Sequence, residues 1–225
     1  PRLHTHIVTA RGRGLAASTS RAPLATGMGA AALGNAVSRE LLKLQFQRVV
    51  FHSGDRPDST LTLQDFQTAY RPLNRANLTA ALHASGAIPF VLTGERDIPG
   101  APAGQYWDGG IIDYHFDLAR LRGDGLILNP HFSERIYTGW FDKFLPWRRA
   151  PLSETENLVL LCPTAAFTAS LPHGKIPDRG DFSRMNDSER ITYWRDCMAR
   201  SEALAREFAA LITGDDPLRG VTVFE

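Results

Sequence analysis

The stretch Leu3-His4-Thr5-His6-Ile7-Val8-Thr9-Ala10 has the pattern of a half-buried β-strand. A loop rich in Gly, Arg and Ser follows over residues 11–21. Between Met28 and Gln47 apolar residues then recur at near-helical spacing, namely Leu33, Val37, Leu41, Leu44 and Phe46. The run Val49-Val50-Phe51 predicts a second strand. Strands separated by a helical segment indicate an α/β fold.

Further elements are expected downstream. Asn77 is a candidate N-cap for a short helix through Leu82. Residues 106–118 are expected to be extended, and residues 158–161 form an apolar run typical of a strand covered on both faces. Asn186 and Glu189 have the spacing of a capping box. The helix that follows carries one apolar stripe, made of Ile191, Trp194, Met198, Leu204, Phe208 and Leu211.

Composition excludes several classes of protein. The 225 residues are 43% hydrophobic, and 25 Lys plus Arg balance 24 Asp plus Glu. A chain this apolar and this close to neutral collapses into a core, and it has no broad basic surface for nucleic acid. No apolar run approaches the roughly 20 residues that span a bilayer. We therefore expect a soluble protein that binds no nucleic acid. Two cysteines are too few for a disulfide framework, which fits a cytoplasmic location.

Three motifs have plain structural alternatives. Gly27-Met28-Gly29 has the outline of a dinucleotide-binding turn, but no strand pattern precedes it, so we expect a loop entering an Ala-rich helix and no cofactor. Asp113, His115 and Asp117 would share one face of a strand, either as metal ligands or as a solvated surface. The two cysteines, Cys162 and Cys197, are expected to be packing residues.

The segment from Trp140 to Arg149 interleaves aromatic rings with cations. Trp140, Phe144 and Trp147 could lie at a lipid interface, where Lys143 and the arginines 148 and 149 would meet anionic phosphates. The alternative is a loop folded onto the domain with its tryptophans buried. Peripheral membrane contact is thus one partner that the sequence suggests.

Asp108-Gly109-Gly110 is the strongest candidate site. Two glycines after an aspartate allow a sharp turn that leaves the carboxylate open to approach. Alone, Asp-Gly is also an ordinary turn signal. The neighbouring sequence adds weight to the functional interpretation.

The residues Ala84-Ser85-Gly86-Ala87-Ile88-Pro89, followed by Asp108-Gly109-Gly110, resemble the last two sequence blocks of the patatin-like phospholipases, A-S-x-x-x-P and D-G-[GA]. The opening strand and the segment from Asn77 to Ser85 also resemble bacterial members of that family. The resemblance covers residues 3–130, and more loosely the rest of the chain.

This resemblance implies an α/β domain with a three-layer, patatin-like arrangement of sheet and flanking helices. It also implies an acyl-ester or lipid hydrolase that uses a Ser-Asp dyad and no cofactor. In that family a Ser in G-x-S-x-G attacks the ester, and the Asp of D-G-G activates the Ser. By position Asp108 takes the base role, and the block containing Ser85 and Pro89, with Gly109 and Gly110, shapes the site.

The chain departs from the family at the nucleophile. Its only glycines four apart are Gly100 and Gly104, and Pro102 lies between them, so G-x-S-x-G is absent. We therefore expect residues 1–225 to be the C-terminal portion of a single patatin-like domain, incomplete at its N-terminus, with the Ser upstream. Part of the core face of the strand at residues 3–10 would then be uncovered. The alternatives are an inactive lipid-binding or interaction module, and a metal-dependent hydrolase.

Overall fold

The structure, a computed structural model, describes residues 3–54, 63, 65–115, 125–148 and 157–222. The chain forms two compact units. Unit 1 comprises residues 1–126 and 136–157, and unit 2 comprises residues 127–135 and 158–225. Helices and strands are interspersed along the chain and the larger sheet is mixed, which confirms the predicted α/β class.

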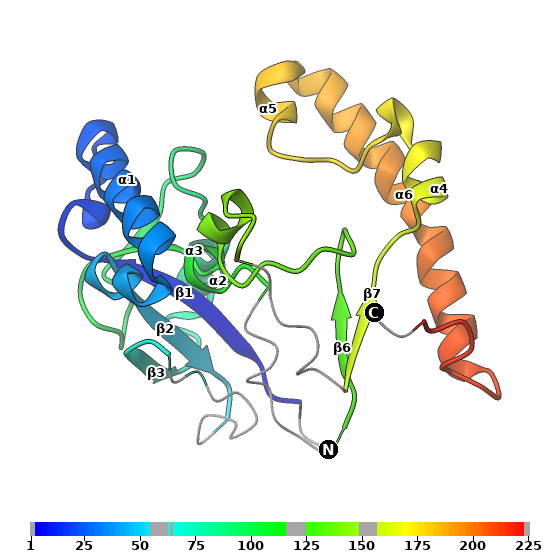
Figure 1. Ribbon diagram of the computed structural model, residues 1–225, viewed down its shortest axis with the longest axis horizontal. Helices are drawn as coiled ribbons and strands as arrows, with labels where there is room; N and C mark the ends of the chain where they lie inside the picture. Colours follow the sequence, from blue (N-terminus) through cyan, green and yellow to red (C-terminus); the bar gives the residue numbers. More distant parts are fainter. Residues whose placement is uncertain (1–2, 55–62, 64, 116–124, 149–156, 223–225) are drawn as a thin grey trace. The chain divides into compact units, whose positions relative to one another are not determined.

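Unit 1 is built on a five-stranded sheet with the strand order β3-β2-β1-β5-β4. Figure 1 shows β1, β2 and β3 side by side in this sheet. The central strand β1 (His6–Gly12) pairs antiparallel with β2 (Phe46–His52) on one side and with β5 (Gln105–Asp108) on the other. The outer strand β3 (Thr68–Pro72) is parallel to β2, and β4 (Glu95–Arg96) is antiparallel to β5.

Helices cover both faces of this sheet. The neighbouring residues Tyr106 and Trp107 point to opposite faces of β5. Trp107 packs in a cluster with residues of α1 (Arg21–Val37), α3 (Gly110–Asp113) and the 3-10 helices η1 (Gly14–Ala17), η2 (Arg39–Leu44) and η4 (Trp140–Phe144). Tyr106 packs instead with α2 (Leu78–Ser85). Helices of unit 1 therefore pack against both faces of the sheet.

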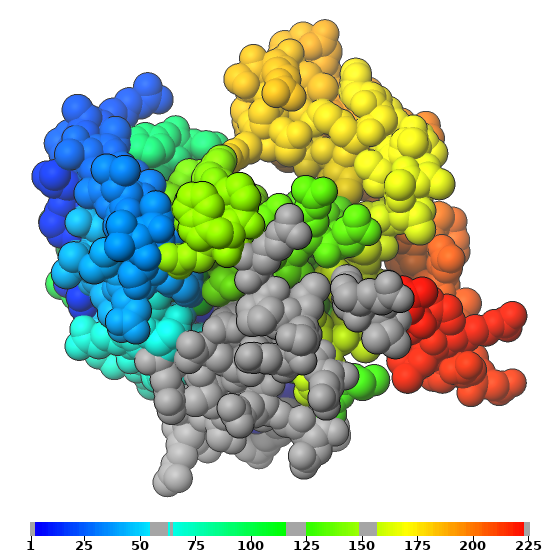
Figure 2. All heavy atoms as spheres, in the orientation of Figure 1, coloured from blue at the N-terminus to red at the C-terminus, as the bar shows by residue number. Residues whose placement is uncertain are grey.

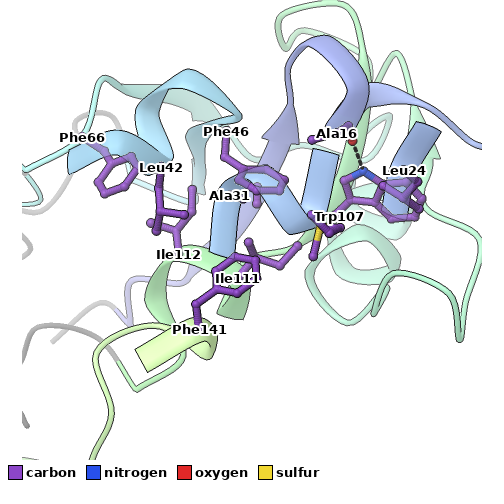
Figure 3. Close-up of a cluster of buried hydrophobic side chains, with 12 residues drawn as sticks. Ala16, Leu24, Ala31, Leu42, Phe46, Phe66, Trp107, Ile111, Ile112 and Phe141 are labelled. Carbon is purple, nitrogen blue, oxygen red and sulfur yellow. Dashed lines mark hydrogen bonds between the residues drawn. The ribbon is translucent and has the colours of Figure 1, made fainter. Parts of the chain in front are cut away.

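Helix α1 approaches η1 closely at Gly27. A Cβ at Gly27 would lie 2.5 Å from the backbone nitrogen of Ala16, so the two segments approach to a distance that only glycine allows. Trp107 Nε1 donates a hydrogen bond of 2.9 Å to the Ala16 carbonyl, as Figure 3 shows within the cluster of buried side chains. Leu24 and Met28 complete the contact.

The predicted helix at residues 28–47 is wrong in its bounds and its face. Helix α1 begins at Arg21 and ends at Val37, and Phe46 already belongs to β2. Leu33 and Val37, which the spacing assigned to the core, are 75% and 80% exposed. The buried residues of α1 lie on another face, made of Leu24, Gly27, Met28, Ala31 and Asn35. This face begins before Met28, so apolar spacing counted from Met28 to Gln47 does not select it.

Two strand predictions also change. The opening strand begins at His6 and continues to Gly12. Within it the residues from Ile7 to Ala10 are buried, so no core face is uncovered there, whereas Leu3, which precedes the strand, is 97% exposed. The strand predicted over 106–118 ends at Asp108, where the chain turns into α3. Ile111 and Ile112 are both buried although they are neighbours, which a helical turn between sheet and η4 allows.

Helix α2 begins after Asn77 as predicted, but the Asn77 side chain does not cap it. Its amide donates to the carbonyls of Pro72 and Pro99 and its oxygen accepts from Asn74 N. Asn77 therefore ties the start of α2 to two loops.

Unit 2 contains a two-stranded parallel sheet, β6 (Ile127–Pro130) with β7 (Leu158–Leu161). Four helical segments follow, namely α4 (Ala165–Ser170), η6 (Pro172–Gly174), α5 (Asp181–Arg184) and α6 (Asp187–Thr213). Strand β7 is half-buried throughout, so the prediction that both its faces are covered is wrong.

Helix α6 starts with the predicted capping box of Asn186 and Glu189. Its buried residues are Tyr193 and Cys197, whereas Ile191 and Met198 of the predicted stripe are exposed. Among the described residues, no helix is long and apolar enough to cross a bilayer.

Candidate functional site

Asp108 is the last residue of β5 and lies opposite Thr9 of the central strand β1. Its side chain is half-buried, and its Oδ1 accepts a hydrogen bond of 2.7 Å from Gly110 N. Burial raises the pKa of Asp108, and the Gly110 hydrogen bond opposes that rise by favouring the charged form. Among the described residues none forms an ion pair with Asp108. The carboxylate is thus held in place by the backbone, and no cation among the described residues pairs with it.

Gly109 and Gly110 make the turn after Asp108 possible. A Cβ at Gly109 would lie 2.3 Å from the Val8 carbonyl oxygen, a collision with backbone that cannot move aside. A Cβ at Gly110 would lie 3.0 Å from Asp108 Oδ1. Both glycines therefore keep the carboxylate close to strand β1 without a side chain in between.

The segment 84–89 lies against the same turn. Asp108 N donates a hydrogen bond of 3.0 Å to the Ala87 carbonyl, and Pro89 is buried. Ser85 Oγ donates to the Val8 carbonyl at 2.8 Å, the carbonyl that also contacts Gly109. The two sequence blocks, separated by 18 residues in the chain, thus meet at one place. Ser85 uses its hydroxyl hydrogen on the backbone and acts there as a structural residue.

Asp113, at the end of α3, is held by a buried arginine of β2. Arg48 donates to it from Nε and Nη2, each at 2.6 Å, and both side chains are almost completely buried. Burial raises the pKa of Asp113, against the hydrogen bonds and charges of Arg48 and Arg39. Burial by itself lowers the pKa of Arg48, but the hydrogen bonds to Asp113 and Asp65 outweigh burial and raise the pKa of Arg48 above the ordinary value.

Arg39 and Asp65 extend this contact into a group of four charges. Arg39 donates to the Ile112 carbonyl at 2.8 Å and lies within 3.4 Å of both aspartates, and Arg48 also binds Asp65 at 2.9 Å. Both guanidinium groups lie over the Phe66 ring. We call these five residues the α3 clamp: Arg39, Arg48, Asp65, Phe66 and Asp113.

The α3 clamp was missed by sequence reasoning. The available signal was Arg48 itself, a cation within the otherwise largely apolar segment of β2, where it must find a partner. The partner could not be named, because Asp113 lies 65 residues away in the chain.

The predicted metal face does not exist in the form proposed. Asp113 is the last residue of the helical turn α3, and His115 follows it. The Asp113 carboxylate is bound by Arg48. His115 Nδ1 accepts a hydrogen bond from Tyr137 N at 2.8 Å, and Asp117 lies outside the described residues. Within the part of the chain that the structure describes, no three His, Cys, Asp or Glu side chains are grouped to hold a metal ion.

Gly27-Met28-Gly29 lies inside α1, so the expected loop before the helix is wrong. Gly27 serves close packing against Ala16, as described above. Cys197 is buried in the core of unit 2, where burial raises the pKa of its thiol, and Cys162 is half-buried after β7.

The aromatic segment around η4 is divided between core and surface. Trp140 is half-buried against the main core cluster, whereas Phe144 and Trp147 are 66% and 69% exposed. Lys143 Nζ lies 3.6 Å from the centre of the Tyr114 ring, and Arg148 donates to the Asn35 carbonyl of α1. Residue 149 lies outside the described residues.

No protein-family model matches this chain, and neither a curated protein nor a solved structure matches it. Any function is therefore argued from the site itself.

Proposed function

We propose that this chain carries the catalytic aspartate of a patatin-like lipid acyl hydrolase. Asp108 is the base, and the Ser nucleophile and oxyanion-hole donors come from outside these 225 residues. The sheet of unit 1, with helices on both faces, would then belong to a three-layer, patatin-like domain. The substrate class is a lipid or another acyl ester.

The geometry around Asp108 supports this proposal most strongly. A base must be positioned, reachable and basic enough to accept a hydroxyl proton. The Gly110 hydrogen bond positions the carboxylate, the absence of an ion pair among the described residues leaves it available, and burial raises its pKa. When the serine attacks the ester carbonyl, its proton passes to Asp108 and backbone N–H groups stabilise the oxyanion.

The position of residues 84–89 in the fold supports the other part of the resemblance, the A-S-x-x-x-P block. The segment 84–89 contacts the backbone of Asp108 through the Ala87 carbonyl, which supports its proposed role as a wall of the site. This is the position in which a site-shaping block is required. Ser85 is excluded from the nucleophile role in this arrangement because its hydroxyl donates to Val8.

A second candidate function is a catalytically inactive lipid-binding module. The missing G-x-S-x-G favours it, since the described chain offers Asp108 no nucleophile. Peripheral contact with lipid is common to both proposals. Phe144 and Trp147 are exposed beside α1, where residues 140–148 reach the surface in Figure 2, and they would supply this contact.

The test is hydrolysis of short p-nitrophenyl acyl esters by the protein expressed from its longest reading frame. Asp108→Asn should lower kcat about 10²- to 10⁴-fold, the usual contribution of a general base, with an unchanged melting temperature. Glu40→Gln, which removes an exposed carboxylate of η2, is the matched control and should keep wild-type activity. Full activity of Asp108→Asn contradicts the proposal, and an inactive wild-type protein favours the binding module.

A further inference from the structure

Helix α6 has two apolar faces, and unit 2 buries only one of them. Tyr193 and Cys197 are buried in the core of unit 2 together with Leu171. Among the described residues of α6, none beyond Cys197 belongs to that cluster. The second face is open, since Ile191 and Met198 are 46% and 69% exposed.

The second face follows a strict seven-residue repeat. Its members are separated by alternating steps of three and four residues, namely Ile191, Trp194, Met198, Ser201, Ala205, Phe208 and Ile212. We call these seven residues the α6 seam. Apolar residues in this spacing form the contact line of a coiled coil. The Ser201 hydroxyl donates to the Met198 carbonyl of the same helix at 2.7 Å, so this polar group has its partner within α6.

The α6 seam lies on a helix that is already formed and fixed. Asn186 caps the helix, and Trp194 Nε1 donates to Asp181 at 3.0 Å, so pairing of the seam needs no helix formation. Ile212, at the far end, is 53% exposed, and Trp194 and Phe208 are half-buried. Single exposed apolar residues are ordinary, but a stripe along most of a 27-residue helix marks an interaction surface.

The sizes of the side chains allow the seam to pair with a second copy of itself. An antiparallel pair centred between Met198 and Ser201 repeats three layers about a two-fold axis: Met198 with Ser201, Trp194 with Ala205, and Ile191 with Phe208. Large side chains face small ones in two of these layers. A parallel pair would instead set Trp194 against Trp194 and Ser201 against Ser201.

The charges beside the seam fit the antiparallel orientation. Arg195 and Glu202 each follow a seam residue by one position, so they line the same edge of the seam. In the antiparallel pair Arg195 faces Glu202 of the second copy, and the two-fold axis repeats this contact. In a parallel pair Arg190 would face Arg195 of the second copy, and like charges repel. Among the described residues Arg195 forms no ion pair, and Glu202 has one long contact, 3.8 Å to Arg206.

We propose that two copies of this chain associate through an antiparallel pair of α6 seams. The reciprocal contacts of Arg195 with Glu202 set the orientation, and the apolar layers supply the stability. A lipid surface fits the seam less well, because an interfacial helix carries mainly cations beside its apolar face, whereas this edge carries both signs. The proposal concerns unit 2 and does not depend on the function proposed for Asp108.

The first test is the mass of the 225-residue chain in solution, measured by sedimentation equilibrium from about 1 to 100 µM. The wild type should dimerise. Ile191→Ser/Met198→Ser removes exposed apolar side chains from four of the six contacts and should raise the dimer dissociation constant about tenfold or more. Leu33→Ser/Val37→Ser truncates two exposed apolar residues of helix α1 and should dimerise like the wild type. Far-UV circular dichroism checks that all variants keep their helices.

The second test reverses charges to determine the orientation. Arg195→Glu faces Glu202 of the second copy and should weaken the dimer several-fold, whereas in a parallel pair it would face Arg190 and strengthen the dimer. Arg195→Glu/Glu202→Arg restores opposite charges and should dimerise like the wild type. Glu207→Arg reverses an exposed charge on the other side of α6 and should have no effect.

Several results would overturn the proposal. They are a monomeric wild type, a dimer that Ile191→Ser/Met198→Ser leaves unchanged, a dimer that Arg195→Glu strengthens, or a double charge variant that fails to recover. A monomeric wild type that binds vesicles, and loses them in Ile191→Ser/Met198→Ser, would assign the α6 seam to lipid and would also overturn it.

Discussion

Asp108 and Asp113 are five residues apart at the two ends of one short segment, yet their surroundings are opposite. Asp113 is buried between two arginines that bind its carboxylate. Asp108 is half-buried and accepts a backbone hydrogen bond from Gly110. The comparison teaches that a buried carboxylate with a complete set of cationic partners serves the fold, whereas one that no cation of the described residues binds is available for chemistry.

The α3 clamp and the glycine turn act on the same segment from opposite ends. Arg48 and Arg39 fix the end of α3 to β2 and η2, and Gly109 fixes its start against Val8. Asp108 is therefore placed by contacts that it does not make itself. This arrangement predicts that the two aspartates respond very differently to substitution.

The largest effect is expected from Arg48→Met. Removing one partner of a buried ion pair leaves an uncompensated charge on Asp113, so the free energy of unfolding should fall by about 3–5 kcal/mol. Urea unfolding measures this loss. The double variant Arg48→Met/Asp113→Asn removes both charges and should be less destabilised than Arg48→Met alone. Equal or greater destabilisation of the double variant would show that the ion pair is not the cause.

The next effect is expected from Gly109→Ala. The added Cβ would meet the Val8 carbonyl oxygen, so the turn must shift and the free energy of unfolding should fall by about 1–3 kcal/mol. Gly29→Ala is the control, because a Cβ there meets no atom and alanine favours a helix. The control should be stabilised slightly in the same urea titration. A loss of similar size in both variants would contradict the steric argument.

A smaller effect is expected from Arg39→Met. Arg39 is more exposed than Arg48 and its contacts with the two aspartates are longer, at 3.3 and 3.4 Å. Loss of its charged hydrogen bond to the Ile112 carbonyl should cost about 1–2 kcal/mol. If Arg39→Met destabilises the protein as much as Arg48→Met, the two arginines contribute equally to stability, and burial does not decide which of them matters more.

Elements that depend on neighbouring residues in the chain are predicted correctly from the sequence. The run Val49-Val50-Phe51 is a strand and Asn186 with Glu189 is a capping box, because both depend on neighbouring residues alone. Asp108 was identified as a candidate from the turn signal that follows it. The meeting of Asp108 with Ala87 was implied only by the family resemblance.

Other features could not be predicted because their causes are distant in the chain. The alternating pattern of residues 106–118 fits a strand, but the Asp108 side chain binds Gly110 N and Arg48 holds Asp113 on a helical turn. The buried face of α1 carries Leu24 and Met28, but the close contact of Gly27 with Ala16 decides that this face, and not the one with Leu33 and Val37, is turned inward. Tertiary contacts overrode local pattern in both places.

The smallest effect on stability is expected from Asp108→Asn, and its dependence on pH tests the comparison most directly. Burial raises the pKa of Asp108 above its ordinary value of 3.8, so the folded protein holds this proton more tightly than the unfolded chain does. Ionisation of Asp108 therefore costs stability as the pH rises from about 4 through the raised pKa, and the full cost is present at neutral pH. Asparagine has no such cost and can still accept the Gly110 hydrogen bond.

At pH 7 the Asp108→Asn variant should be as stable as the wild type within about 0.5 kcal/mol, or more stable, and any advantage should disappear below pH 4. Urea titrations at pH 7 and pH 3.5 measure the two values. A variant that is strongly destabilised at pH 7 would place Asp108 with Asp113 as a residue that serves the fold.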